Sequence, residues 1–125
     1  MNEMTYAMVI DDNRQTAEAL SQMLKLWDIP VRISLNPSSA MVLLGDVVPR
    51  IVFLDINMPG VNGFEVLGFL KREPRLAGVP VIIVTSDDQP ETARRALDGG
   101  AAAIVIKPVM SEMIEEALKK AGILP

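Results

Sequence analysis

Five short runs of apolar residues, several of them rich in valine and isoleucine, recur along the chain. They lie at Tyr6–Ile10, Val31–Leu35, Ile51–Leu54, Val81–Val84 and Ala103–Ile106. Most of these runs are continuous rather than alternating, which is typical of parallel strands buried on both faces. The segments between the runs have helical spacing, so the pattern predicts a strand followed by a helix, repeated five times.

Polar residues and glycines mark where several of the predicted helices begin and end. Asp12 and Gln15 have the spacing of a capping box at the start of the first helix. Asp88 and Glu91 repeat that spacing before the fourth helix, and Gly99–Gly100 marks the end of the same helix. These signals predict that Asp12 and Asp88 cap the first and fourth helices.

The last predicted helix carries an apolar stripe that includes Met110 and Met113 at helical spacing. We interpret both methionines as core residues, because the flexible methionine side chain fills gaps between packed elements.

Right-handed crossovers between successive parallel strands place helices on both faces of a sheet. The pattern therefore predicts an α/β fold in which a five-stranded parallel sheet lies between two layers of helices. The chain has 125 residues and a mass of 13.6 kDa, which fits a single domain expected to span residues 1–125.

The composition narrows the possible chemistry. The chain has no cysteine and no histidine, which excludes disulfides, thiol nucleophiles, zinc sites and histidine acid–base catalysis. The formal net charge is −4, so we expect no direct binding to nucleic acid. No apolar run approaches the ~20 residues that span a bilayer, and the acidic Glu3 stands where a signal peptide would be basic. We therefore expect a cytoplasmic protein without membrane insertion.

Chemically active side chains occur where four of the five predicted strands end. These are Asp11 and Asp12 after the first strand, Asp55 at the third, Thr85 at the fourth and Lys107 at the fifth. The carboxyl ends of parallel strands meet at one edge of the sheet, where ligands bind near the point at which strand order reverses. We expect these three carboxylates, one hydroxyl and one ammonium to converge at that edge.

Clustered carboxylates raise one another's pKa unless a cation lies among them. Mg²⁺ suits such a cluster, since it prefers oxygen ligands and binds one or two carboxylates together with waters and a phosphate oxygen. A carboxylate held there can act as a nucleophile and form an acyl phosphate. Lys107 would then offset the charge of the transferred group, and the Thr85 hydroxyl would reach one of its oxygens.

These residues, in this order, resemble the receiver domain of bacterial two-component response regulators, and in particular single-domain chemotaxis receivers. The motifs are Val9–Asn13, Leu54–Gly63, Val84–Ser86, Gly100–Ala101 and Lys107–Pro108, and the resemblance covers essentially the whole chain. It implies a flavodoxin-like (βα)5 sandwich with strand order 2-1-3-4-5. It also implies phosphorelay signal transduction by a protein that phosphorylates and dephosphorylates itself but is not a metabolic enzyme.

The resemblance implies a role for each acidic residue. Asp55 would accept a phosphoryl group from a phosphohistidine on a sensor histidine kinase or histidine phosphotransfer protein. That donor must be another chain, because this one has no histidine. Asp12 and Asp55 would bind Mg²⁺ directly, together with the backbone carbonyl of Asn57, while Asp11 would act mainly through water.

The same resemblance extends to the remaining site positions. Thr85 and Lys107 would contact the phosphoryl group, and the Lys107–Pro108 peptide bond would be cis. Asn57 and Asp87 occupy the two variable positions that tune self-dephosphorylation in the family. An acidic side chain at Asp87 would help orient the attacking water, so we expect a transient phosphorylated state.

One position departs from the family pattern. Many receivers have Tyr or Phe three residues before the lysine, and this chain has Ile104 there. A branched aliphatic side chain cannot make the inward swing of an aromatic ring. The face formed by the fourth helix, fifth strand and fifth helix is the family's usual site for a downstream protein target. We expect either that switching runs through smaller shifts of the loop after Val81–Val84, or that the output surface lies elsewhere.

Several other functions stay open on the sequence alone. A Mg²⁺-dependent phosphohydrolase also forms an aspartyl phosphate, but it usually has a second Asp where this chain has Asn57. A nucleotide- or flavin-binding module needs a glycine-rich turn after the first strand, where this chain has the acidic Asp11–Asn13. A receiver that works without phosphorylation is a further alternative, as is a receiver cut from a larger hybrid kinase or transcription factor.

Overall fold

Parallel strands and α-helices alternate along residues 5–125, the part of the chain that the computed structural model describes. The strands are β1 (Ala7–Ile10), β2 (Val31–Ser34), β3 (Ile51–Asp55), β4 (Val81–Thr85) and β5 (Ala103–Ile106). The α-helices are α1 (Arg14–Leu24), α2 (Pro37–Leu44), α3 (Gly63–Arg72), α4 (Pro90–Asp98) and α5 (Ser111–Lys120), and a 3-10 turn, η1 (Lys25–Trp27), follows α1. Glu3, used above in the argument about a signal peptide, lies outside the described residues.

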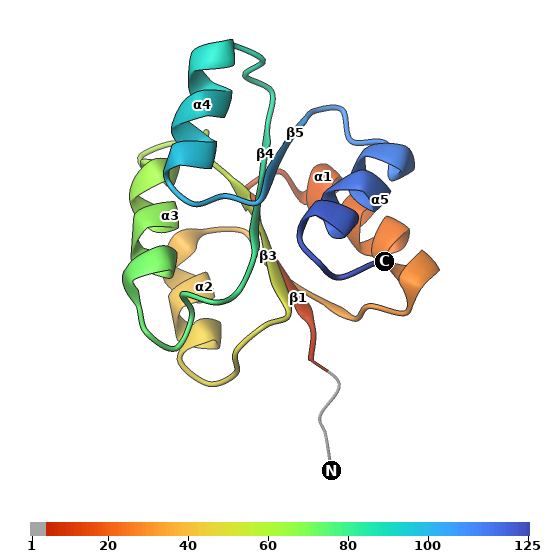
Figure 1. The fold of residues 1–125 in the computed structure, drawn as a ribbon. Coiled ribbons are helices and arrows are strands. Elements are labelled where there is room, and N and C mark those ends of the chain that lie inside the picture. The colour runs from red at the N-terminus through yellow and green to blue at the C-terminus, as the bar shows by residue number, and fades with distance from the viewer. Residues whose placement is uncertain (1–4) are drawn as a thin grey trace.

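The five strands form one parallel sheet in the order β2-β1-β3-β4-β5 (Figure 1). Ala7 of β1 pairs with Val31 of β2 on one side and with Ile51 of β3 on the other. The second strand is thus added on one side of β1, and the third and later strands are added on the other side. The strand order therefore reverses between β1 and β3, whose carboxyl ends lie side by side. This topology confirms the expected α/β fold with strand order 2-1-3-4-5.

Two hydrophobic cores hold the helices against opposite faces of the sheet. Helices α2, α3 and α4 pack on one face, and α1 and α5 pack on the other (Figure 1). Met8 of β1 is fully buried in the first core, and Phe53 of β3 is buried in the second. Burying one such side chain stabilises a fold by roughly 1.5–3 kcal/mol. The central strands, which end at the candidate site, are therefore firmly anchored on both sides.

The edge strands differ from the central ones. β1, β3 and β4 are buried along their whole length, as their continuous apolar runs predict. β2 and β5 have partly exposed positions, and in β5 the half-buried Ile104 and Ile106 alternate with the buried Ala103 and Val105. The prediction of burial on both faces is wrong for these two strands, because each has a neighbouring strand on one side only.

Two predicted helix caps are wrong by one residue. Asn13, not Asp12, caps α1, since its side chain accepts a hydrogen bond from the Thr16 N–H at 3.0 Å. At α4 the boundary residue is Gln89 rather than Asp88, and its side chain makes no capping bond. The end of α4 is confirmed, because the helix stops at Asp98 and Gly100 adopts a positive φ of 104°.

The methionines of the last helix are not core residues. Met110 and Met113 are 51% and 40% exposed, while α5 buries Ile114, Ala117 and Leu118 against the sheet. The interpretation of Met110 and Met113 as core filler is therefore wrong. Met110 precedes the helix with extended backbone, and Met113 lies at the edge of the apolar stripe rather than at its centre. Within the described part of the chain, every helix is too short or too polar to cross a membrane.

Candidate functional site

The strand ends bring the predicted site residues together at one edge of the sheet. Asp11 directly follows β1, and Asp55 and Thr85 are the last residues of β3 and β4. Lys107 directly follows β5, and its ammonium nitrogen Nζ lies 3.1 Å from Asp11 Oδ2 and 3.4 Å from Asp55 Oδ2. Residues 96 and 52 positions apart in the sequence thus meet around one ammonium.

The two buried carboxylates are oriented in the same way by their local backbone. Asp11 Oδ1 accepts a hydrogen bond from the Asn13 N–H at 2.8 Å, and Asp55 Oδ1 accepts one from the Asn57 N–H at 2.9 Å. In both cases the side chain binds the backbone two residues ahead, which fixes its direction. The second oxygen of each carboxylate, Oδ2, therefore faces Lys107.

Charge in this pocket is only partly balanced. Asp11 and Asp55 are 1% and 3% exposed, and within residues 5–125 only Lys107 forms an ion pair with either carboxylate. Asp11 Oδ2 is buried and receives no hydrogen bond, since the 3.1 Å contact with Lys107 lacks hydrogen-bond geometry. Burial raises the pKa of Asp11, and the charge of Asp55 raises it further, although the Asn13 N–H and Lys107 partly oppose this.

Three carboxylates of the site have the arrangement of a metal centre. One oxygen from each of Asp11, Asp12 and Asp55 lies within 4.8 Å of the other two. Oxygens on one Mg²⁺ at the usual 2.0–2.1 Å are separated by at most about 4.2 Å, so the cluster is close to the size of a magnesium shell. The ligand chemistry, the excess negative charge and the unpartnered Asp11 Oδ2 all fit a hard divalent cation. Asp12 differs from the other two in being exposed, on the solvent side of the cluster.

The hydroxyl of Thr85 joins the site to the two variable positions. Thr85 is fully buried, and its Oγ1 accepts a hydrogen bond from Asn57 Nδ2 at 2.8 Å and another from the Asp87 N–H at 3.1 Å. Asn57, on the loop after β3, and Asp87, on the loop after β4, are thus tied to one atom. Both contacts use the lone pairs of Oγ1, so a group that accepts a hydrogen bond from the Thr85 O–H does not compete with them.

The carboxylate of Asp87 is directed at the start of α4. Its Oδ1 accepts from the Gln89 N–H at 3.0 Å, and its Oδ2 accepts from the Thr92 hydroxyl at 2.7 Å. These two bonds lower the pKa of Asp87, with the Thr92 bond contributing most. Sequence reasoning missed Thr92, although the hydroxyl five residues after an acid at a helix entrance was a visible signal.

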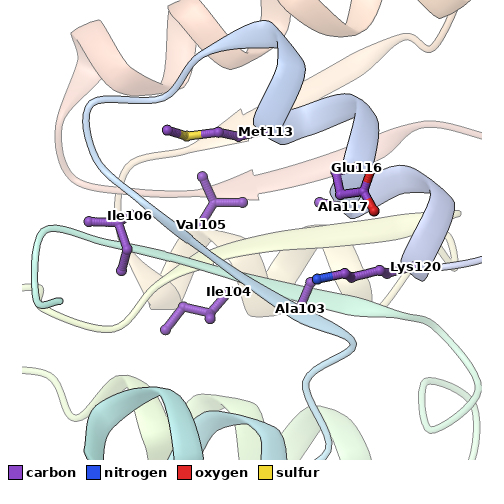
Figure 2. A pocket seen from close by; sticks show the side chains of 8 residues that line it. All are labelled: Ala103, Ile104, Val105, Ile106, Met113, Glu116, Ala117 and Lys120. Atoms are coloured by element: carbon purple, nitrogen blue, oxygen red, sulfur yellow. The ribbon is translucent and has the colours of Figure 1, made fainter. Parts of the chain in front are cut away.

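The Ile104 position lies away from the carboxylates, on the edge strand. Ile104 is half-buried and packs against the core under α3 and α4. It also lines a groove of about 250 Å³ between β5 and α5, where Met113 lies toward Ile106 and Lys120 lies toward Ala103 (Figure 2). The Lys107–Pro108 peptide bond, which connects this strand to α5, is cis.

Comparison with known proteins identifies the family. A family model described as the response regulator receiver domain matches residues 7–119. The chain belongs to this family of receiver domains. It is 34% identical over 107 residues to the two-component response regulator ORR13 of Oryza sativa subsp. japonica, covering 83% of this chain and 87% of that protein. It is also 31% identical over 102 residues to protein RcaC of Microchaete diplosiphon, but this receiver spans only 16% of the length of RcaC.

Solved structures agree with this assignment. The chemotaxis protein CheY4 of Vibrio cholerae superposes with a TM-score of 0.85 over 95% of this chain and 99% of that one, and at 20% identity it shows the shared fold. The signal receiver domain of a DNA-binding response regulator (merR) from Colwellia psychrerythraea 34H has a TM-score of 0.85 at 29% identity, covering 93% of this chain and 96% of that one. The family match favours a receiver over the phosphohydrolase and the nucleotide- or flavin-binding module considered above.

Proposed function

We propose that this receiver accepts a phosphoryl group on Asp55 from a phosphohistidine of a sensor histidine kinase or histidine phosphotransfer protein. The proposal depends on a single observation, namely the contacts and burial of the Asp55 carboxylate. One oxygen is fixed by the Asn57 N–H, and the other, Oδ2, lies 3.4 Å from the Lys107 ammonium in a pocket that is almost closed to solvent. The protein would act as a cytoplasmic switch rather than as a metabolic enzyme.

The transfer is a displacement at phosphorus. Asp55 Oδ2 attacks the phosphorus of the phosphohistidine, a P–O bond forms, and the P–N bond breaks. The electron pair of the broken bond stays on the imidazole nitrogen of the donor protein. Lys107 offsets negative charge on the transferred group, and the Thr85 hydroxyl donates a hydrogen bond to one of its oxygens.

The carboxylate cluster supports a magnesium requirement for this step. Asp12 and Asp55 would hold Mg²⁺ directly with the backbone carbonyl of Asn57, and Asp11 would bind it through water. The ion would supply positive charge beside the phosphoryl oxygens. Asp11 and Asp55 already face the same small space, which the chain itself leaves with an excess of negative charge.

Asn57 and Asp87 flank the reacting group and would set how long the phosphoryl group stays on Asp55. Both are hydrogen-bonded to Thr85 Oγ1, so both adjoin the position that the phosphoryl oxygens would occupy. Hydrolysis of the acyl phosphate needs a water aligned with the P–O bond, and a polar side chain at the rim can orient that water where it is free to hydrogen-bond to it.

The face formed by α4, β5 and α5 would bind the downstream protein target. Apolar side chains are exposed at Leu97 of α4, at Met110 before α5 and at Met113 of α5, and Met113 also lines the groove between β5 and α5 (Figure 2). Exposed apolar side chains gathered beside a groove are typical of protein-contact surfaces. The loop from Thr85 to α4 connects this face to the phosphorylation site.

Incubation with a small-molecule acyl phosphate, followed by intact mass measurement, tests the proposal. We expect the mass to rise by one phosphoryl group with Mg²⁺ and to stay unchanged when the metal is chelated. Asp55→Asn removes the nucleophile and should abolish the increase, whereas Asp98→Asn, an acid at the end of α4 and away from the site, should not. Equal labelling of the wild type and Asp55→Asn would contradict the proposal.

A further inference from the structure

Both oxygens of the Asp87 carboxylate are already occupied by donors from the first turn of α4. The Gln89 N–H lies 3.0 Å from Oδ1, and the Thr92 hydroxyl lies 2.7 Å from Oδ2. The second bond is the shorter one and comes from a side chain, so it depends on a single residue. Thr92 is half-buried, and its bond to Asp87 is partly buried.

The backbone of Asp87 nevertheless lies at the rim of the phosphorylation pocket. Its N–H donates to Thr85 Oγ1 at 3.1 Å, and the same oxygen accepts from Asn57 Nδ2 at 2.8 Å. Asp87 thus has its main chain beside the site and its carboxylate turned away from it. A carboxylate can orient or deprotonate a water only through an oxygen that is free to accept a hydrogen bond.

We propose that Thr92 is a positioning residue that holds the Asp87 carboxylate on α4 and thereby lengthens the lifetime of the phosphoryl group on Asp55. This inference rests on the proposed function, since it concerns the loss of that same phosphoryl group. Thr92 touches neither the phosphoryl group nor the attacking water, and it acts only through Asp87.

The step that Thr92 slows is hydrolysis of the acyl phosphate. The oxygen of a water molecule attacks phosphorus, and the bond between phosphorus and the Asp55 carboxylate oxygen breaks. The electron pair of that bond returns to Asp55, the water loses a proton to solvent or to a free carboxylate, and inorganic phosphate leaves. A released Asp87 Oδ2 would accept a hydrogen bond from the water as it attacks.

Four variants and the wild type test this inference by the decay of the phosphorylated mass after the donor is removed. Thr92→Val keeps the shape of the side chain but loses the hydroxyl, and we expect the phosphoryl half-life to fall about three- to tenfold, less than the ~10²–10⁴-fold effect of a fully placed general base. Thr92→Ser keeps the hydroxyl and should restore the half-life of the wild type. Asp87→Ala should not shorten it, and Thr92→Val combined with Asp87→Ala should behave as Asp87→Ala alone.

Two results would overturn the role of Thr92 while leaving phosphorylation of Asp55 intact. One is an unchanged half-life in Thr92→Val. The other is a shortened half-life that persists when Asp87 is also replaced, because the effect would then come from a loosened α4 rather than from the carboxylate.

A second measurement tests the Thr92–Asp87 contact without any phosphoryl group. Carboxyl NMR of the unphosphorylated protein should show the pKa of Asp87 below its ordinary value in the wild type and in Thr92→Ser, and a higher pKa in Thr92→Val. An unchanged pKa in Thr92→Val would refute the inference even if Asp55 accepts no phosphate, whereas absence of phosphorylation alone refutes the proposed function.

Discussion

The buried carboxylate of Asp11 has one oxygen bonded to the Asn13 N–H and a second, Oδ2, that receives no hydrogen bond. Burial raises its pKa above the ordinary value of 3.8, so the folded state holds a proton on Asp11 more tightly than the unfolded state does. Ionisation of Asp11 therefore opposes folding. Without metal, its contribution to stability becomes more favourable as the pH falls through the raised pKa, and it levels off below the unfolded value near 3.8.

Asp11→Asn should stabilise the metal-free protein at neutral pH. The amide oxygen can still accept from the Asn13 N–H, and the side chain carries no charge to desolvate and none to repel Asp55. We expect a gain of about 1 kcal/mol in the free energy of unfolding, measured by urea denaturation in the presence of a chelator. The gain should shrink as the pH falls through the raised pKa of Asp11, because wild-type Asp11 then becomes protonated.

Magnesium should reverse this ranking, because a cation among the carboxylates offsets the negative charge that Lys107, shared by Asp11 and Asp55, does not balance. We expect Mg²⁺ to raise the melting temperature of the wild type more than that of Asp11→Asn. The reason is that an ion which binds only the folded state stabilises it, and the wild type should bind Mg²⁺ more tightly. Asp98→Asn, which is remote from the cluster, should respond to Mg²⁺ as the wild type does. A destabilised Asp11→Asn at neutral pH without metal would contradict this account of the pocket.

At the scale of single residues, the sequence predicted which residues lie at the site better than it predicted the hydrogen bonds that they form. Asp11, Asp55, Thr85 and Lys107 could be assigned to one edge because each ends or follows an apolar run. The choice of Asn13 over Asp12 as helix cap could not, because it depends on which of three consecutive polar residues adopts the extended backbone with φ −90° and ψ 105°. The direction of the Asp87 carboxylate could not be predicted either, since it can turn toward the carboxylate pocket or toward hydrogen-bond donors at the start of α4.

At the scale of elements, the connection between β3 and α3 fixes the position of Asp55. The first residue of α3, Gly63, packs so closely on Ile56 that a Cβ there would overlap the Ile56 Cα and come within 2.7 Å of its Cβ. Because Ile56 is buried and directly follows Asp55, neither partner can move without shifting the backbone next to Asp55.

Gly63→Ala should therefore be strongly destabilising. We expect a loss of about 2–4 kcal/mol in the free energy of unfolding by urea denaturation, in the range of overpacked core positions. The matched control is Gly78→Ala, since a Cβ at Gly78 would meet no atom within 4 Å. That variant should lie within about 1 kcal/mol of the wild type, and equal stability of the two variants would contradict the close packing of Gly63 on Ile56.

Strands were predicted correctly where burial alone determines their place in the sheet. The continuous apolar runs of β1, β3 and β4 indicated central strands correctly, because burial on both faces leaves a plain signal in the sequence. β2 alternates apolar and polar residues, which marks a partly exposed strand, whereas the continuous apolar run of β5 gave no sign that it lies at an edge of the sheet. The exposure of Met110 and Met113 could not be predicted from the stripe either, because α5 begins only at Ser111 and buries the side of the stripe that carries Ile114, Ala117 and Leu118.

At the scale of the whole molecule, the question is how phosphorylation reaches the α4–β5–α5 face without an aromatic residue at position 104. Ile104 is packed against the core beneath α3 and α4, and its branched side chain has no ring to rotate. The hydrogen bonds from Thr85 Oγ1 through Asp87 to Thr92 instead form a continuous connection from the site to the start of α4.

Phosphorylation should therefore move the loop between β4 and α4 more than it moves Ile104. With excess acyl phosphate and Mg²⁺, we expect large NMR shift changes for the backbone amides of residues 86–89, 91 and 92 and a small change for the Ile104 side-chain methyl groups. The methyl groups of Ile114, buried under the opposite face of the sheet, serve as the unaffected reference. A change at Ile104 as large as that of the loop would show that the edge strand itself switches.

The central claim is that Asp55, within a pocket of carboxylates that needs a cation, forms an acyl phosphate. Borohydride reduces an acyl phosphate to a primary alcohol, so it converts a phosphorylated aspartate to homoserine and leaves a free carboxylate unchanged. The deciding measurement is peptide mapping by mass spectrometry after phosphorylation with Mg²⁺ and borohydride treatment. The account predicts homoserine at Asp55, no conversion at Asp11 or Asp12, and none at any of the three without Mg²⁺. Conversion at a different carboxylate, or at Asp55 without the metal, would contradict it.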